Sequence, residues 1–297
     1  MEAYQQYLIP EVIAKLKRID LKARLVVEGF LTGLHRSPYK GFSCEFAEYR
    51  SYMPGDELKR IDWKIYAKTD RFFIREYEEE TNLKAYLLLD ASGSMSYTSG
   101  KISKLEYSEY LAASLGYLLI KQRDSVGLAI FTSQLDNYIP PRSVPTHLSS
   151  LLKTIEQVKP GGDTDLANTF HQLAEKIRRR GLIIIFSDLF DDKEKVISSL
   201  HHFRHKKHEV LVFHILDKNE LDFNFPQPLI LRDLESNKEI TLDPRVIKKD
   251  YKKALNEFMF DFKRRCREYM IDYHLITTDT PLDKALLYYL EKRRRLW

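Results

Sequence analysis

The chain has 297 residues, of which 43% are hydrophobic, so it can bury a packed core and is unlike a disordered chain. Lys and Arg outnumber Asp and Glu by 48 to 43, a small excess that gives little support to nucleic-acid binding. No apolar run reaches the roughly 20 residues of a membrane-spanning helix, and the first residues do not resemble a signal peptide. Cys44 and Cys266 are the only cysteines, which excludes a disulfide framework. We therefore expect a cytoplasmic protein without membrane contacts.

The first predicted segment, residues 1–34, is an N-terminal amphipathic helix. Pro10 suits a first helical turn, where a missing backbone N–H costs nothing. The apolar side chains that recur at helical spacing are Val12, Ile13, Leu16, Ile19, Ala23, Val26, Val27 and Phe30. We expect a single helix over residues 11–34 that docks this stripe against the rest of the chain.

The second predicted segment, residues 35–82, is a small subdomain rich in β-structure. A Pro-Gly pair at 54–55 marks a tight turn, and residues 71–78 alternate in polarity as a strand does. Its dense mixture of charges is typical either of a surface that recognises a partner or of an internal network of ion pairs, and both interpretations stay open. The residues of such a partner surface would be Arg50, Asp56, Arg60, Asp62 and Trp63.

The third predicted segment, residues 83–297, alternates strands with helices. The predicted strands are 85–89, 125–132, 135–140, 182–187, 209–216, 229–233, 239–242 and 273–277. The predicted helices are 102–122, 144–158, 166–180, 194–205, 245–270 and 282–295. This alternation is typical of an α/β fold, in which a mostly parallel sheet has helices on both faces.

Polar side chains follow two of the predicted strands and open one of the predicted helices. Because ligands bind beyond the carboxyl ends of parallel strands, we expect these side chains to lie close together. They are Asp90, Ser92 and Ser94, then Thr164 after a Gly-Gly pair, then Asp188. Carboxylate and hydroxyl oxygens are the ligands that Mg²⁺ or Mn²⁺ prefers. The alternative is that these residues are helix caps and turn residues.

These three segments resemble the metal-ion-dependent adhesion site of von Willebrand factor A (vWA) domains. The upstream segments 35–41, 45–50, 54–56 and 61–67 resemble the signature of a bacterial family of unknown function, which carries a vWA-like domain and is usually encoded beside a MoxR-type AAA+ ATPase. The resemblance implies a vWA/Rossmann-like fold for residues 83–297. It also implies that Ser92 and Ser94 bind the metal directly, that Thr164 binds it in the active state, and that Asp90 and Asp188 act directly or through water.

The function that follows from this resemblance is non-catalytic, divalent-metal-dependent protein binding. In such sites a partner carboxylate takes the open coordination position. The partner would be a MoxR-type AAA+ ATPase or a client protein, with this chain as adaptor or co-chaperone. The alternatives are a metal-dependent hydrolase or phosphatase that uses Asp90, and a nucleic-acid-binding vWA protein. The phosphatase would need a second Asp two positions after Asp90, where the chain has Ser92.

Four histidines lie close together in the sequence, at positions 201, 202, 205 and 208. Positions 201 and 205 would share one face of a helix and could bind a transition metal, although no Cys or carboxylate completes the set. The alternative is a group of solvated side chains at the end of a helix.

Overall fold

The structure is a computed structural model. It describes residues 9–36, 49–51, 63, 66–67, 70–75, 83–162, 164–225, 229–232 and 239–294. The chain divides into two units, one made of Met1–Gly33 with Leu83–Trp297 and the other of Leu34–Asn82.

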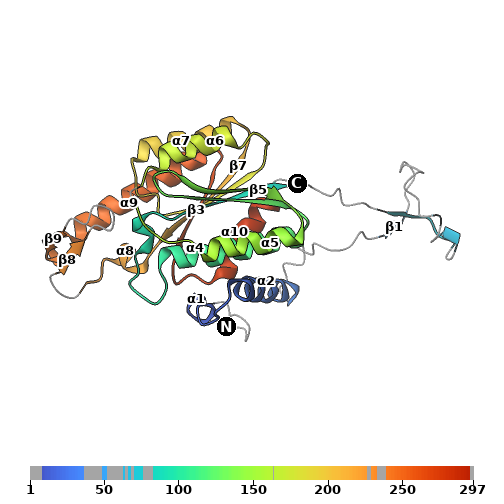
Figure 1. The fold of residues 1–297 in the computed structure, drawn as a ribbon, viewed down its shortest axis with the longest axis horizontal. Coiled ribbons are helices and arrows are strands. Elements are labelled where there is room, and N and C mark those ends of the chain that lie inside the picture. Colours follow the sequence, from blue (N-terminus) through green and yellow to red (C-terminus); the bar gives the residue numbers. More distant parts are fainter. Residues whose placement is uncertain are drawn as a thin grey trace. The chain divides into compact units, whose positions relative to one another are not determined.

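The larger unit is built on a six-stranded sheet. Its strands are β3 (Lys84–Asp90), β4 (Ser125–Phe131), β5 (Leu135–Arg142), β6 (Leu182–Ser187), β7 (Glu209–Leu216) and β10 (Asp272–Thr277). They lie in the order β10-β7-β6-β3-β4-β5, and every neighbouring pair is parallel except β4 with β5 (Figure 1). The predicted mostly parallel α/β sheet is therefore confirmed.

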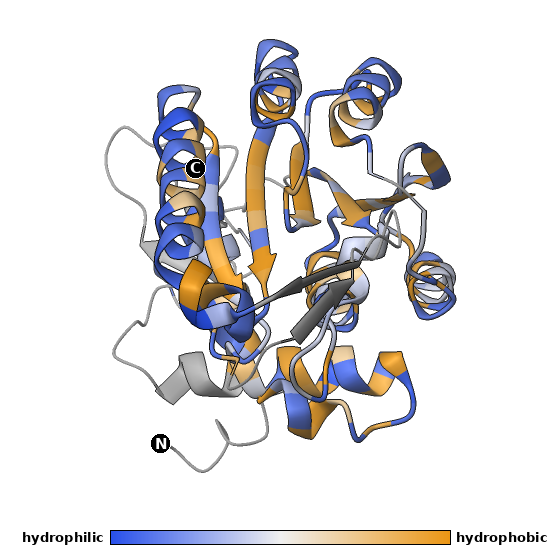
Figure 2. Ribbon diagram, turned by 90° about the vertical axis from the view of Figure 1, so that its left-hand side faces the viewer, coloured by the Kyte–Doolittle hydropathy of each residue, from blue (hydrophilic) through white to orange (hydrophobic). Residues whose placement is uncertain are grey.

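The central strands are apolar because helices cover both faces of the sheet. Every residue of β6 is buried, as are the last six residues of β3 and of β4. Figure 2 shows these strands mostly in the colour of hydrophobic residues, whereas the helices carry both colours. Edge strand β5 has only partly buried and exposed side chains and contains Pro140 and Pro141, which an edge position tolerates.

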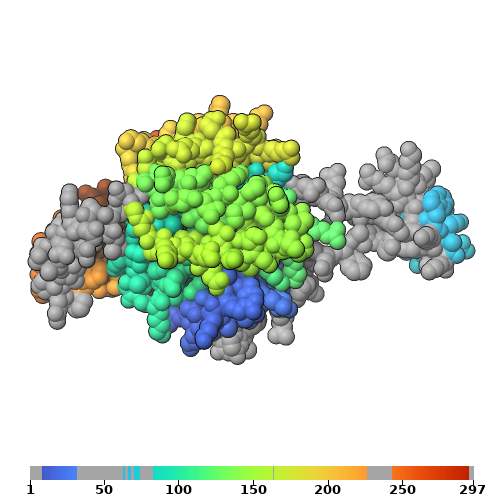
Figure 3. Space-filling model, in the orientation of Figure 1, coloured from blue at the N-terminus to red at the C-terminus, as the bar shows by residue number. Residues whose placement is uncertain are grey.

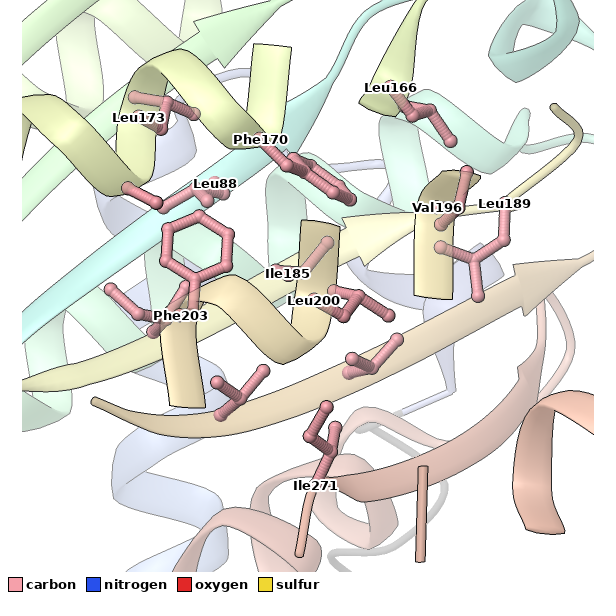
Figure 4. Packing of buried hydrophobic residues seen from close by; sticks show 14 of the residues in the cluster. Leu88, Leu166, Phe170, Leu173, Ile185, Leu189, Val196, Leu200, Phe203 and Ile271 are labelled. Atoms are coloured by element: carbon pink, nitrogen blue, oxygen red, sulfur yellow. The ribbon is translucent and has the colours of Figure 1, made fainter. Parts of the chain in front are cut away.

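Helices α6 (Leu166–Lys176), α7 (Lys193–His205) and α9 (Pro244–Glu268) pack on one face of the sheet (Figure 1). Their apolar side chains form one cluster with residues of β3, β6 and β7, in which Phe170, Ile185 and Phe203 are fully buried (Figure 4). Helices α4 (Lys104–Lys121) and α10 (Leu282–Arg294) cover the other face, and α5 (Pro145–Glu156) packs on α4. None of the described helices combines the length and the apolar character that crossing a membrane requires.

The prediction of one continuous N-terminal helix is wrong. The chain forms α1 (Pro10–Ile13) and α2 (Ile19–Arg36), with a turn between them. On a continuous helix, Ile13 and Ile19 would point about 120° apart, since successive residues turn by about 100°. Both side chains are buried in the structure, and the break allows this. Helix α2 lies against α4, where the Lys22 ammonium donates a 3.0 Å hydrogen bond to the Tyr110 hydroxyl. Figure 3 shows the N-terminal helices, in blue, next to green atoms of the chain.

Two short elements lie between β7 and α9. Helix α8 (Lys218–Asp222), which the sequence did not predict, begins with a capping box between Asp217 and Glu220. Strands β8 (Leu229–Arg232) and β9 (Glu239–Leu242) pair in antiparallel fashion, as expected for the predicted hairpin.

The smaller unit contains strands β1 (Tyr49–Ser51) and β2 (Phe73–Arg75), which pair in antiparallel fashion, with Arg50 opposite Ile74. Trp63 is 59% exposed and its ring meets those of Tyr66 and Phe72 edge to face. The other residues of the predicted partner surface, Asp56, Arg60 and Asp62, lie outside the described residues. The choice between a partner surface and an internal network stays open.

Glu109 of α4 should make a pH-dependent contribution to the stability of the fold. Burial, followed by the negative charge of Glu106, raises the pKa of Glu109 from 4.5 to about 8. A carboxyl group whose pKa is higher in the folded state stabilises the fold below its unfolded pKa, and this stability is lost as the pH rises through about 8. Glu109→Gln should therefore raise the midpoint of thermal unfolding at about pH 9 and leave it nearly unchanged at about pH 4. A change of about 1 kcal/mol in the free energy of unfolding shifts the midpoint of thermal unfolding by roughly 2–4 °C.

The matched control for this prediction is Glu257→Gln, because Glu257 is an exposed glutamate of α9. Its midpoint should follow that of the wild type at both pH values. Equal midpoints of wild type and Glu109→Gln at the higher pH would contradict the prediction.

Candidate metal centre

Asp90 ends strand β3, between the ends of β4 and β6, and its side chain is fully buried. Both carboxylate oxygens accept hydrogen bonds. The Ser92 backbone N–H donates to Oδ1 at 2.9 Å, and the Ser187 hydroxyl at the end of β6 donates to Oδ2 at 2.6 Å. Burial, and next the charge of Asp188, raise the pKa of Asp90 to about 7. A cation at this position would offset both effects.

The segment after β3 presents two hydroxyl groups beside this carboxylate. Ser92 precedes a short 3₁₀ helix, Gly93–Ser96, and its Oγ lies 3.2 Å from the Oγ of Ser94. Burial raises the pKa of Asp188, and the Ser94 hydroxyl is one of the nearby groups that lower it. Four of the five predicted ligands, Asp90, Ser92, Ser94 and Asp188, are therefore brought together at the carboxyl edge of the sheet.

The two glycines that precede Thr164, the fifth predicted ligand, are hydrogen-bonded to the segment after β3. The Gly93 N–H donates to the Gly162 carbonyl at 3.2 Å, and the Gly161 N–H donates to the Ala91 carbonyl at 3.0 Å. Gly162 has a φ of 77°, a left-handed conformation that glycine adopts readily. Thr164 follows two residues later and is partly buried. The segment that carries it is thus hydrogen-bonded to the segment that carries Ser92 and Ser94.

Asp188 follows strand β6 and forms a buried ion pair that the sequence did not predict. The Lys104 ammonium donates to Asp188 Oδ2 at 2.8 Å and to Glu220 Oε1 at 2.7 Å. The side chains of Lys104 and Asp188 are each 1% exposed. Burial alone would raise the pKa of Asp188, but the charge of Lys104 holds it below its usual value. Likewise, the charges of Asp188 and Glu220 outweigh burial and raise the pKa of Lys104.

The sequence contains one weak signal for this ion pair. Lys104 is the first residue of α4, after the N-cap Ser103, and the helix dipole disfavours a cation there. A lysine in that position therefore indicates a compensating negative charge. Its two acidic partners lie 84 and 116 positions away along the chain, so the sequence does not identify them.

The backbone beside Asp188 is strained. Leu189 has a φ of 57°, which is uncommon for a leucine and costs of the order of 1–3 kcal/mol. Its side chain is fully buried, and its N–H donates to the Ser187 hydroxyl at 2.9 Å. Ser187 thus orients both Asp90 and the chain that follows Asp188, and strain of this kind clusters at functional sites.

The loops beyond β7 and β10 are connected to the same edge by Asp217. Its carboxylate accepts hydrogen bonds from the backbone N–H groups of Ser99 and Asn219, at 3.0 and 2.8 Å, and from the Thr278 hydroxyl at 3.4 Å. The segment between β3 and α4 is therefore linked to two further strand ends, which limits how far it can move.

The donor set at this edge fits a hard divalent cation. Two carboxylates and two hydroxyls converge there, and oxygen ligands of these kinds suit Mg²⁺ and Mn²⁺. The site also contains a cation of its own, because the Lys104 ammonium already neutralises part of the charge of Asp188. Asp90, Ser92 and Ser94 are the residues best placed to contact an ion directly.

Fold and site define an α/β protein with a polar centre at the carboxyl edge of a mostly parallel sheet. Residues 48–258 match the family described as "Protein of unknown function DUF58", and the chain belongs to this family. An uncharacterised protein of Mycobacterium tuberculosis is 26% identical over 293 residues, which are 96% of this chain and 91% of the relative. The prediction of a family of unknown function is confirmed, whereas the association with a MoxR-type ATPase stays a prediction.

Solved structures with a similar fold include vWA-type proteins. The conserved hypothetical protein BatB from Bacteroides thetaiotaomicron is similar with a TM-score of 0.48 and 14% identity, over 72% of this chain and 99% of that chain. The VWA domain of SpRpn10 is similar with a TM-score of 0.43 and 12% identity, over 69% of this chain and 94% of that chain.

The buried ion pair generates a prediction about stability. Lys104→Met removes the cation that pairs with the carboxylates of Asp188 and Glu220. These two side chains are only 1% and 14% exposed, respectively. Breaking a buried pair in this way costs about 3–5 kcal/mol. Urea unfolding near neutral pH should show a loss of this size in the free energy of unfolding.

The matched control is Lys101→Met, three residues earlier. Lys101 pairs with Glu11 at 2.9 Å, but the two side chains are 75% and 54% exposed. Water screens such a surface pair, so this variant should lose much less stability than Lys104→Met. Similar losses in the two variants would show that the buried lysine has no special role.

Proposed function

We propose that this chain is a non-catalytic protein-binding module whose sheet-edge centre binds Mg²⁺ or Mn²⁺. The observation that carries the proposal is the convergence of buried Asp90 with the hydroxyls of Ser92 and Ser94, which lie 3.2 Å apart. When bound, the ion would supply a positive charge to which a carboxylate of the partner protein binds.

The residues of the chain have separate tasks in this proposal. Asp90, Ser92 and Ser94 would bind the ion, and Thr164 would join them from the neighbouring segment. Ser187 orients Asp90 through its 2.6 Å hydrogen bond. Lys104 keeps Asp188 ionised and limits the excess of negative charge at the centre.

The environment of Asp90 supports binding over hydrolysis. A phosphatase of the kind considered above uses one Asp as nucleophile and a second, two positions later, as acid and base. Here the residue two positions later is Ser92, and both oxygens of Asp90 already accept hydrogen bonds. These contacts orient the carboxylate as a fixed ligand, which is why we propose a module without catalytic activity.

The partner that we propose is a MoxR-type AAA+ ATPase or one of its client proteins, in the cytoplasm. This choice rests on the family resemblance of the upstream segments. The sheet-edge centre contributes the chemical requirement, because a cation bound there would select an acidic residue on the partner surface. A purified candidate ATPase from the same organism is therefore the first protein to test.

The proposal predicts that Mg²⁺ stabilises the wild-type chain and that Asp90→Ala abolishes this effect. A ligand that binds only the folded state adds about 2.7 kcal/mol at a hundredfold excess over its dissociation constant. Thermal unfolding and calorimetric titration with Mg²⁺ and Mn²⁺ measure the effect. Because Asp90 is buried, the partly buried Ser94→Ala provides a second variant, and it should weaken metal binding without unfolding the chain.

The control variant is Ser96→Ala, since Ser96 lies in the same 3₁₀ helix but its hydroxyl donates to the Gly93 carbonyl. It should bind Mg²⁺ as the wild type does. Co-purification with the candidate ATPase should occur in Mg²⁺ and fail in EDTA or with Asp90→Ala. If the ATPase still binds in EDTA and still binds Asp90→Ala, the metal-dependent mechanism is refuted. If the wild-type chain takes up neither Mg²⁺ nor Mn²⁺, the metal centre itself is refuted.

A further inference from the structure

A groove of about 690 Å³ lies along helices α6 and α7, away from the sheet-edge centre. Four histidines line it, His171 from α6 and His201, His202 and His205 from α7. The two helices pack side by side on the same face of the sheet (Figure 1). Nothing in the proposed protein-binding function uses these side chains.

Two imidazole rings face each other across the groove. The Nδ1 atoms of His171 and His202 are 2.9 Å apart, and the ring centroids are 4.5 Å apart. On the other side of His202, its Nε2 lies 3.2 Å from Glu175 Oε1. His171 and Glu175 are four residues apart on α6, so they share one face of that helix.

Within the described part of the chain, His171, Glu175 and His202 form a group of nitrogen and carboxylate side chains that could hold a metal ion. One ligand atom from each of His171, Glu175 and His202 can be chosen so that all three lie within 4.8 Å of one another. Two nitrogens bound to one ion at about 2.0–2.1 Å are themselves about 2.9–3.4 Å apart for ligand angles between about 90° and 110°. The observed separation of the two nitrogens lies at the lower end of that range.

We propose that His171, His202 and Glu175 form a binding site for a transition-metal ion, Zn²⁺ in the first instance, that connects α6 to α7. Two imidazoles and one carboxylate are a ligand set that zinc uses in proteins, with the fourth position filled by water or another side chain. His205 lines the same groove.

The ion replaces weak contacts. The Glu175 side chain is 59% exposed and pairs with the Lys206 ammonium at 2.6 Å. Water screens an exposed pair of this kind, so its loss is a small penalty for a metal–ligand bond. The proton between the two imidazoles is likewise exchanged for the ion, since metal-bound histidine must offer a lone pair.

The structure also corrects the histidine cluster expected from the sequence. His208 is buried, with Nε2 lying 3.2 Å from the Ile177 carbonyl, so it takes no part in the groove. The His201 ring packs against the ring of Tyr269, the residue after α9, with the ring centroids 4.2 Å apart. The essential second imidazole, His171, comes from another helix, 31 positions earlier in the chain. The histidine cluster considered from the sequence had no carboxylate, and Glu175 of the same helix supplies it.

This site and the sheet-edge centre differ in chemistry. Imidazole nitrogen favours zinc, nickel and copper, whereas the oxygen ligands around Asp90 favour magnesium and manganese. Zinc can therefore be measured in the presence of saturating Mg²⁺. The two sites also share no ligand, so each can be removed without touching the other.

The test is a calorimetric titration of the full chain with Zn²⁺, in metal-free buffer supplemented with Mg²⁺. We expect the wild type to bind one Zn²⁺ at micromolar or lower concentration. His171→Ala and His202→Ala should each weaken binding at least tenfold. His201→Ala is the matched control, since it removes a histidine of the same groove that belongs to no ligand group, and it should bind as the wild type does.

Two further measurements identify the ligands. Co²⁺ in place of Zn²⁺ should give a visible absorption band that His171→Ala and His202→Ala lose.

Asp90→Ala should retain zinc binding, so failure of the magnesium centre leaves this proposal intact. Circular dichroism without zinc should show that the surface variants fold. Wild-type affinity in either histidine variant, no zinc uptake by the wild type, or loss of zinc binding in an Asp90→Ala chain that circular dichroism shows to be folded would overturn the proposal.

Discussion

Two carboxyl groups, those of Asp90 and Asp188, are buried side by side at the ends of adjacent strands, and the cost of burying these charges, followed by their mutual repulsion, is the constraint around which this edge of the sheet is organised. Parallel pairing of β3 with β6 makes the juxtaposition unavoidable, because both strands end at the same edge. A hydroxyl and a backbone N–H orient one carboxyl group, and the Lys104 ammonium neutralises the other. Since each burial is costly without such partners, the surrounding loops can adopt few other arrangements.

The compensation extends beyond the two strands. Lys104 also binds Glu220, and Glu220 in turn belongs to the capping box that Asp217 begins. Asp217 accepts from Ser99, in the loop that follows the serines of the centre. The residues that neutralise the buried charges and those that position the loops therefore belong to one network, which connects the ends of β3, β6 and β7. Functional groups on loops are most accurately positioned when rigid elements and hydrogen bonds support them, as they do here.

Helix α6 connects the two candidate metal sites of the molecule. Its N-terminus follows the segment of Thr164, and the Leu166 N–H donates to Asp191 beyond β6 at 2.8 Å. Its apolar face packs in the core, where Phe170 and Leu173 are fully buried. Its outer face carries the imidazole and carboxylate of the groove. One amphipathic helix therefore contributes to the core, begins directly after the segment that carries Thr164, and carries two of the proposed zinc ligands along its side.

The sequence by itself determined the α/β class, because buried parallel strands are short apolar runs and helices show their own period. It also located the strand-end residues Asp90 and Asp188, since polar residues after such runs lie at one edge. Only the tertiary structure decided the partners of Lys104, the pairing of His171 with His202, and the break between α1 and α2. The physical reason is that periodicity is a local property of the chain, whereas side-chain partners far apart in sequence are set by how helices pack on the sheet.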